Sequence, residues 1–307
     1  MTADWLHPAL RFAQYAVLLG LFGSLTFRLP GLRGLAAPPI ATGPATRTAA
    51  MVAPFLTVAV MLIGIADMMG QALWDLDRTT IASMVLTTDM GTAFLARVAL
   101  LGGAATVLAL VKPVTRSQAV AAWLYAVALL TLAWNGHAAV SEGWLGLVHR
   151  LNDWAHLMAA GIWMGAIGWF TLLILVAHRE PARMPPAPLL RLMHRFRPVG
   201  VALVGVVALT GTINAHLIFG IANSLAMLQT RYGWLLAAKV LLVVLMLLCA
   251  ACHARVAAQI AGKPERDSSI ADATLAKLRG SLTVELVLAV GVLITVALAG
   301  VAAPMPD

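Results

Sequence analysis

Eight long apolar runs, separated by short polar loops, dominate this sequence of 307 residues. Each run supplies the roughly 20 apolar residues that a helix needs to cross about 30 Å of hydrocarbon. The runs are continuously apolar and do not alternate with a period of two, so they predict helices rather than barrel strands. We expect the spans at about Leu10–Phe27, Ala49–Leu73, Thr92–Val111, Ala119–Asn135, Asn152–Ala177, Pro198–Ile221, Gly233–His253 and Leu282–Ala302.

The composition indicates a protein embedded in a bilayer rather than one folded in water. Apolar residues make up 61% of the chain and charged residues 11%, against roughly 45–50% and 25% in a typical soluble domain. We therefore expect an all-α fold, a bundle of about eight transmembrane helices that forms a single integral-membrane domain over residues 1–307 and is surrounded by lipid. The first run is not expected to be a cleaved signal peptide, because no cleavage site closes it.

The distribution of positive charge predicts the orientation of the bundle. The formal net charge is +8, but the basic residues form short runs between spans rather than a face or a tail, so no nucleic-acid partner is expected. Of the 21 Lys and Arg residues, fifteen follow odd-numbered spans, four lie on the opposite side, and Arg97 and Lys239 lie within spans. Because basic loops stay in the cytoplasm, both termini are expected on the periplasmic side.

Histidines gather at the predicted outer ends of spans four, five and six. They are His137, His149, His156 and His216. If the fifth helix begins as early as His149, this residue, Asp153 and His156 share one face of it, and Asn152 precedes His156 by four residues. Histidine is costly in lipid, so each is expected to face the bundle interior, water or a partner. Each one alone is also explained as an interfacial histidine bonded to a carbonyl, but four at one depth favour a metal-binding mouth.

Methionines and acids share this outer side. Met68 and Met69 follow Asp67, and Met90 follows Asp89. Thioether sulfur is a soft ligand suited to Cu(I), and imidazole accepts either copper oxidation state, so a mixed mouth favours copper over magnesium, calcium or manganese. Eight acids against four bases on this side would also concentrate cations. The alternatives are that methionine only fills gaps in the packing and that the acids only keep the loops soluble.

Two further groups lie deeper or on the inner side. Cys249 and Cys252 precede His253 in a CxxCH string, which is the c-type haem attachment motif, but the predicted cytoplasmic position favours a soft-ion exit site or simple packing instead. Glu285 and Lys239 lie several residues inside their spans, and charges at such depth indicate a functional site or an ion pair. Lys239 is expected to pair with Asp67, Asp89 or Asp153, and Glu285 with a basic residue of the inner loops.

Short motifs in order along the chain resemble the copper resistance protein D (CopD) family. They are Asn135-Gly136-His137-Ala138, Asn152-Asp153-Trp154-Ala155-His156-Leu157, Gly161-Ile162-Trp163-Met164-Gly165, His194-Arg195-Phe196, Thr210-Gly211, the stretch Tyr232–Lys239, Glu285 and Pro304. The resemblance is strongest over residues 135–304. It implies a multi-pass protein of the bacterial inner membrane that handles copper, often beside a periplasmic CopC-type copper-binding protein. It supports as matched positions His137, His156, Trp163, Lys239 and Glu285.

Three functions follow from these patterns. The first is a copper permease in which His137, His149, His156, Met68, Met69, Met90 and His216 capture copper, which then passes Glu285 toward Cys249 and Cys252. The second is a cytochrome with haem b held by histidines such as His137, His156 and His216. The third is a scaffold that docks a periplasmic copper chaperone without moving metal. The chain has no nucleophile–base pair, phosphate loop or dinucleotide fingerprint, so an enzyme is not expected.

Overall fold

The computed structural model describes residues 5–31, 43–112, 114–135, 143–182, 184–220, 224–261 and 268–302. Within these ranges the chain is helical and contains no strand. The elements are α1 (Leu6–Gly31), α2 (Gly43–Met69), η1 (Leu73–Asp75), α3 (Arg78–Thr87), α4 (Asp89–Leu110), α5 (Val114–Leu130), η2 (Thr131–Asn135), α6 (Gly143–Arg179), α7 (Pro186–Phe219), α8 (Ser224–Met227), α9 (Arg231–Ala261) and α10 (Ser268–Ala299).

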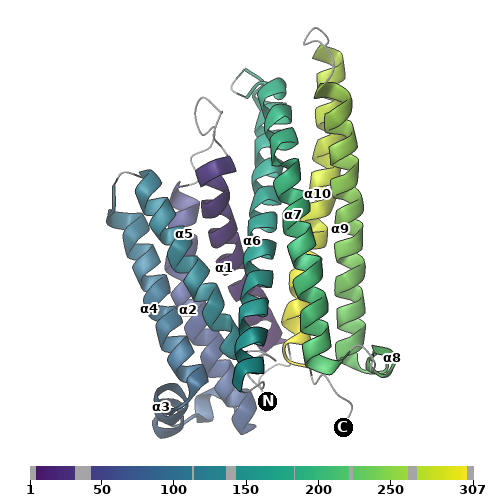
Figure 1. Cartoon of the computed structure of the whole chain (residues 1–307). Coiled ribbons are helices and arrows are strands. Elements are labelled where there is room, and N and C mark those ends of the chain that lie inside the picture. The colour runs from purple at the N-terminus through teal and green to yellow at the C-terminus, as the bar shows by residue number, and fades with distance from the viewer. Residues whose placement is uncertain are drawn as a thin grey trace.

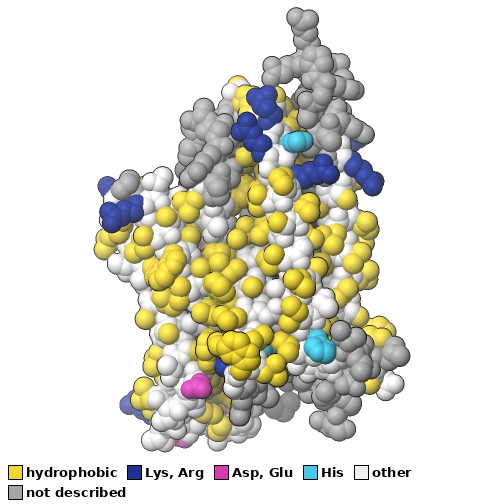
Figure 2. Space-filling view, viewed as in Figure 1, with side chains coloured by type: hydrophobic (Ala, Val, Ile, Leu, Met, Phe, Trp, Pro, Cys, Tyr) yellow, Lys and Arg dark blue, Asp and Glu magenta, His cyan; other side chains and the backbone are white. Residues whose placement is uncertain are grey.

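Eight of these helices are long and apolar enough to cross a membrane, which confirms the predicted all-α bundle of eight spans. Figure 1 shows them side by side, with α1 beginning and α10 ending at the same end, which we call the terminal end. At the opposite end Lys and Arg side chains gather above a band of hydrophobic surface (Figure 2), and we call this the basic end. The separation of charge that the sequence predicts is therefore present in the folded chain.

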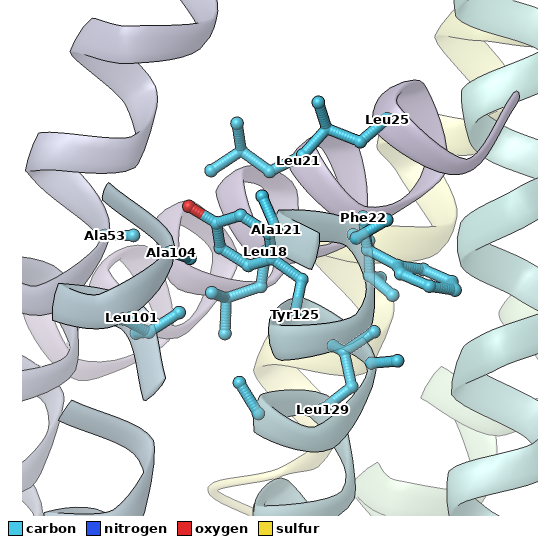
Figure 3. Packing of buried hydrophobic residues seen from close by; sticks show 14 of the residues in the cluster. Leu18, Leu21, Phe22, Leu25, Ala53, Leu101, Ala104, Ala121, Tyr125 and Leu129 are labelled. Atoms are coloured by element: carbon cyan, nitrogen blue, oxygen red, sulfur yellow. The ribbon is translucent and has the colours of Figure 1, made fainter. Parts of the chain in front are cut away.

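The helices pack in two groups joined by α1. The first group contains α2, α4 and α5, and the second contains α6, α7, α9 and α10. Figure 3 shows the core of the first group, where Leu18 and Phe22 of α1 meet Tyr125 and Leu129 of α5 and Leu101 of α4. Because α1 also packs along α6 and reaches α10, it connects both groups.

Glycines set the close crossing of α1 and α6. A Cβ on Gly23 would overlap the backbone of Gly161, and a Cβ on Gly165 would overlap the backbone of Gly23. Small residues of this kind let two membrane helices approach at backbone distance and gain van der Waals contact. The Gly161–Gly165 pair seen in the sequence is thus a helix-packing motif.

Several boundaries differ from the predicted ones. The fifth span was expected to begin at Asn152, but α6 begins at Gly143, so the region of His149 is helical. The sixth span was expected to begin at Pro198, but α7 begins at Pro186 and continues through Pro198. A proline inside a membrane helix is tolerated because neighbouring helices satisfy the freed backbone groups. The short helix α3 was not predicted; it begins where the Asp77 carboxylate accepts a hydrogen bond from the Thr80 N–H at 2.8 Å.

Candidate functional site

His156 lies on the side of α6 that faces α7. Its Nδ1 is 2.9 Å from Thr210 Oγ1, and the Thr210 hydroxyl lies 2.6 Å from the carbonyl oxygen of Val206. The hydroxyl has one proton, which it donates to Val206, so its oxygen accepts the hydrogen bond from His156 Nδ1–H. This arrangement favours the imidazole tautomer with its lone pair on Nε2, which is the form in which a histidine binds a metal ion.

Amide side chains extend this contact into a polar network between α6 and α7. Asn152 Nδ2 donates to the Thr210 carbonyl oxygen at 2.9 Å and to Asn214 Oδ1 at 2.7 Å. Asn214 Nδ2 donates in turn to Asp153 Oδ1 at 3.2 Å. Asn152, Asp153 and His156 thus all reach polar groups of α7, whereas these contacts do not include His149, which was predicted on the same face.

Lys239 supplies the positive charge nearest to this network. Of the three acids proposed as its partner, Asp153 is the one whose charge interacts with it. Lys239 also acts electrostatically on His156, and Tyr232 of α9 lies within the field of Asp153. Charged groups at this depth are stable only when they face the bundle interior and one another, so α6, α7 and α9 enclose a polar cluster in the half of the bundle nearer the terminal end. We call Asn152, Asp153, His156, Thr210, Asn214 and Lys239 the polar cluster.

A cavity of about 340 Å³ lies between α6, α7, α9 and α10, nearer the basic end. Its walls are mainly apolar and include Trp163, Phe170 and Phe196. Its polar lining comes from Glu285, which is 2% exposed, and from His194 and Arg197 at the basic end of α7. Trp163 is buried among the helices and follows His156 on α6 by seven residues, which is one heptad. One helix face therefore connects the polar cluster to the cavity.

The other predicted ligands do not gather around His156. His149 is buried on α6 and His216 is exposed near the end of α7. Met68 and Met69 are exposed at the end of α2, which packs against α1 and α4, whereas His156 faces α7. Met90 packs against the apolar cluster of Met61, Ile65 and Phe94. His137 lies outside the described residues.

The cysteines also lie apart from the cavity. On α9 its lining residues are Leu247, Ala250 and Ala251. Cys249 is half-buried and Cys252 is exposed, both as free thiols, and at a rotation of about 100° per residue they fall on another side of the helix. Their exit role stays a prediction.

Two polar contacts near the terminal end were missed by the sequence analysis. His7 Nδ1 lies 2.6 Å from Asp67 Oδ2, which ties the start of α1 to the end of α2. Arg97, only 1% exposed, donates from Nε to Thr131 Oγ1 at 2.8 Å and from one terminal nitrogen to the Thr131 carbonyl and Asn135 Oδ1 at 2.6 and 2.7 Å. The sequence could have indicated the His7–Asp67 contact, because both residues lie at the same predicted membrane face. It could have indicated the contacts of Arg97, because an arginine inside a span needs partners.

The acids of the terminal end remain on the surface. Asp75, Asp77 and Asp89 are exposed, as is Asp67. Hydrogen bonds from the Thr79 hydroxyl and from the Thr80 N–H and hydroxyl lower the pKa of Asp77 far below its ordinary value, so this carboxylate keeps its charge in acid. We call the exposed carboxylates Asp67, Asp75, Asp77 and Asp89 the negative patch.

The described residues do not contain three His, Cys, Asp or Glu side chains that converge as a ready metal site. A metal ion bound at His156 would need additional ligands from water or from residues beyond that set. Haem fits less well, because His149 and His156 lie on one helix and His216 is exposed. Axial haem ligation needs nitrogens that meet from facing helices or one open pocket beside a histidine, and the haem alternative receives no support from this arrangement.

Comparison with known proteins gives a consistent result. Residues 1–147 match the family model described as copper resistance protein D-like, N-terminal domain, and residues 190–299 match the model of copper resistance protein D. Copper resistance protein D of Pseudomonas syringae pv. tomato is 34% identical over 248 residues, 79% of each chain. Inner membrane protein YebZ of Escherichia coli (strain K12) is 29% identical over 199 residues, 64% of each chain.

A third relative covers a smaller part. Copper transport protein CutJ of Bacillus subtilis (strain 168) is 37% identical over 125 residues, which are 41% of this chain and 22% of CutJ. No solved structure matches significantly.

Proposed function

This chain belongs to the copper resistance protein D family, and we propose that it carries copper inward across the bacterial inner membrane through the helices α6, α7, α9 and α10. The family and the eight apolar spans make it a multi-pass inner-membrane protein with a role in copper transport or homeostasis. The proposal adds the direction, the site and the route. In this proposal residues 1–307 form one integral-membrane unit, with the terminal end in the periplasm and the basic end in the cytoplasm.

One observation supports the proposal: the hydrogen bonds of Thr210 favour the His156 tautomer whose Nε2 lone pair can bind a metal ion. An imidazole whose second nitrogen is held by a neighbour is the usual form of a histidine ligand. Imidazole accepts either oxidation state of copper, and waters or His137 complete the coordination. Asp153 and Asn214 provide the negative and polar surroundings that a cation needs at this depth.

The residues at the terminal end act before His156 in this proposal. Met68, Met69 and His216 are exposed there and collect copper, while the negative patch of Asp67, Asp75, Asp77 and Asp89 docks a periplasmic CopC-type protein and raises the local cation concentration. Glu285 lies further along the route. His149 and Met90 stay candidates for ligands only if their packing opens, since His149 is buried and Met90 is half-buried against an apolar cluster.

Transport is tested in proteoliposomes that contain the purified chain and an internal copper indicator. Wild-type protein is expected to raise internal copper well above empty liposomes, and His156→Gln is expected to abolish most of this rise while His216→Gln leaves a large part of it. Equal uptake by wild type and His156→Gln contradicts the site. Docking of the copper-binding partner without any flux identifies a scaffold instead, and an intense Soret band in the absorption spectrum identifies a cytochrome.

A further inference from the structure

Four buried residues separate the polar cluster from the cavity. Trp163 of α6, Val207 of α7, Met246 of α9 and Ala289 of α10 belong to one hydrophobic cluster, and each is less than 10% exposed. Each of the four helices thus contributes to this apolar layer, and α6 also adds Ala159 and Ile167. We call this layer the plug.

The helix rise gives the order of these features along the bundle. Phe219 and Ala299 pack in one cluster near the terminal end and serve as a common level. At about 1.5 Å per residue, Thr210 lies about 13 Å above this level, Val207 about 18 Å, and Glu285 about 21 Å. His194 lies about 37 Å above it, so the cavity extends for roughly 16 Å from Glu285 to the basic end.

The plug contains one group that binds soft metal ions. The thioether of Met246 is 3% exposed, and Met246 follows Lys239 by seven residues on α9, about 10 Å further toward the basic end. Thioether sulfur binds Cu(I), whereas the other plug residues offer copper no comparable donor. A carboxylate, Glu285, lies at about the same height, at the deep end of the cavity. Tyr232 shares the common level of Phe219 and Ala299, so Met246, fourteen residues further along α9, also lies about 21 Å above that level.

We propose that the cavity is the inner half of the copper route, and that Met246 in the plug and Glu285, which lies at the same height, are the two ligands that receive copper from His156. This inference rests on the proposed function and goes beyond it by naming the ligands and the exit. Copper leaves His156 Nε2, moves about 8 Å toward the basic end and binds the Met246 sulfur and the Glu285 carboxylate, and its oxidation state does not change. The ion then leaves along His194 toward the basic end, without passing Cys249 or Cys252.

The role of sulfur is tested by Met246→Leu, which keeps an apolar side chain of similar volume and removes the donor. We expect copper uptake in proteoliposomes to fall at least tenfold with an unchanged melting temperature in detergent. The matched control is Met61→Leu, because Met61 is equally buried, at 4% exposure, in the other helix group. Wild-type uptake by Met246→Leu overturns the proposal, as does an equal loss in both variants.

The role of the carboxylate is tested by Glu285→Gln, with Glu285→Asp as the conservative variant. The amide is expected to lower uptake at least tenfold and the shorter acid to restore part of it. If a Glu285 variant does not elute as a single species in detergent, its uptake is not used. The labelling experiment below, on protein that keeps Glu285, then tests the cavity. Uptake of Glu285→Gln at the wild-type rate overturns the proposal.

Labelling tests whether the cavity contains water and opens at the basic end. In a Cys249→Ser/Cys252→Ser background, Ala250→Cys places a thiol in the cavity wall, and Leu248→Cys places one on the exposed apolar surface of α9. A membrane-impermeant maleimide applied from the basic end is expected to react at least tenfold faster with Ala250→Cys, and Ag⁺ to slow that reaction. Equal rates, or no effect of Ag⁺, overturn the proposal.

These outcomes distinguish a failure of the proposed function from a failure of the proposed inner route alone. No copper flux through the wild-type protein removes the proposed function itself. Flux through wild type that is lost in His156→Gln but kept in Met246→Leu and Glu285→Gln removes only the route proposed beyond the plug.

Discussion

His156 of α6 and Thr210 of α7 form a hydrogen bond between the two helices, with 2.9 Å between Nδ1 and Oγ1. The Thr210 hydroxyl reaches the Val206 carbonyl at 2.6 Å, so the threonine oxygen is the acceptor and the tautomer with Nε2 unprotonated is favoured. A position that supports a ligand in this way is expected to affect metal affinity without touching the metal.

Thr210→Val is therefore expected to weaken copper binding while it keeps the shape of the side chain. Loss of the group that orients a histidine ligand typically lowers metal affinity about 10- to 100-fold. We expect at least a tenfold higher Kd in a competition titration, and recovery in Thr210→Ser, which retains the hydroxyl.

Thr212→Val is the matched control for this prediction. Thr212 lies on the same helix, is exposed, and makes the same kind of hydrogen bond to a carbonyl four residues earlier, that of Ala208, at 2.9 Å. If Thr210→Val and Thr212→Val bind copper equally well, Thr210 does not orient the ligand.

Asp153 and Lys239 are expected to depend on each other for stability. Each single variant, Asp153→Asn or Lys239→Met, leaves one charge in the bundle without its opposite. The double variant is expected to be more stable than the two single losses predict, by a coupling of about 1–3 kcal/mol. Melting temperatures of the four proteins in one detergent measure this coupling, and strictly additive losses would show that the two charges act independently.

The fold was predictable because its main physical signal is local. A run of apolar residues long enough to cross the bilayer requires a helix there, whatever its neighbours are. The ends were less predictable: α6 begins at Gly143 and α7 at Pro186, ahead of the polar stretches at residues 149–153 and 194–197 that interrupt the apolar runs. The backbone hydrogen bonds of a helix continue beyond the hydrocarbon core of the bilayer. An apolar run therefore predicts the membrane-spanning part of a helix and not the residues at which the helix begins and ends.

The site was predictable only where its residues lie on one helix. The spacing of Asn152, Asp153 and His156 indicated one face, and all three reach α7. Which helix they meet depends on the packing of the bundle, and no periodicity encodes it. For that reason Asp153 was one of three possible partners for Lys239, and Met68 was grouped with His156 although α2 packs elsewhere. Met246 was not singled out, because a buried methionine looks like packing until its layer is known.

Gly165→Leu is expected to disrupt the joint between the two helix groups. A side chain there would overlap the backbone of Gly23 on α1, so α1 and α6 must separate. Overpacking a tight contact costs about 1–3 kcal/mol, and we expect the high end of this range together with a lower yield of folded protein. Gly168→Leu on the same helix is the control, since no atom lies within 4 Å of a Cβ placed there; similar melting temperatures of the two variants would contradict the close crossing.

Arg97→Met is expected to destabilise the first helix group. It removes three hydrogen bonds and leaves the Thr131 carbonyl and Asn135 Oδ1 without their donor, at about 1–3 kcal/mol for each buried group left unpaired. Arg97→Lys is expected to recover little, because one ammonium lacks the fork of the guanidinium. Thermal unfolding in detergent is the measurement, with the exposed Arg78→Gln as control, and a lysine variant as stable as wild type would contradict the fork.

Met68→Leu/Met69→Leu is expected to change the capture of copper but not its passage. Both methionines are exposed at the end of α2, beside Asp67, and lie in a different helix group from the polar cluster. A group that only collects the ion contributes to binding and not to the slow step. The copper concentration for half-maximal uptake is therefore expected to rise severalfold with an unchanged maximal rate, in contrast to Met246→Leu, which is expected to lower the maximal rate.

Uptake measured over a range of copper concentrations separates these cases. A double variant with a reduced maximal rate would place Met68 and Met69 on the route itself, and one with unchanged kinetics would remove them from copper handling.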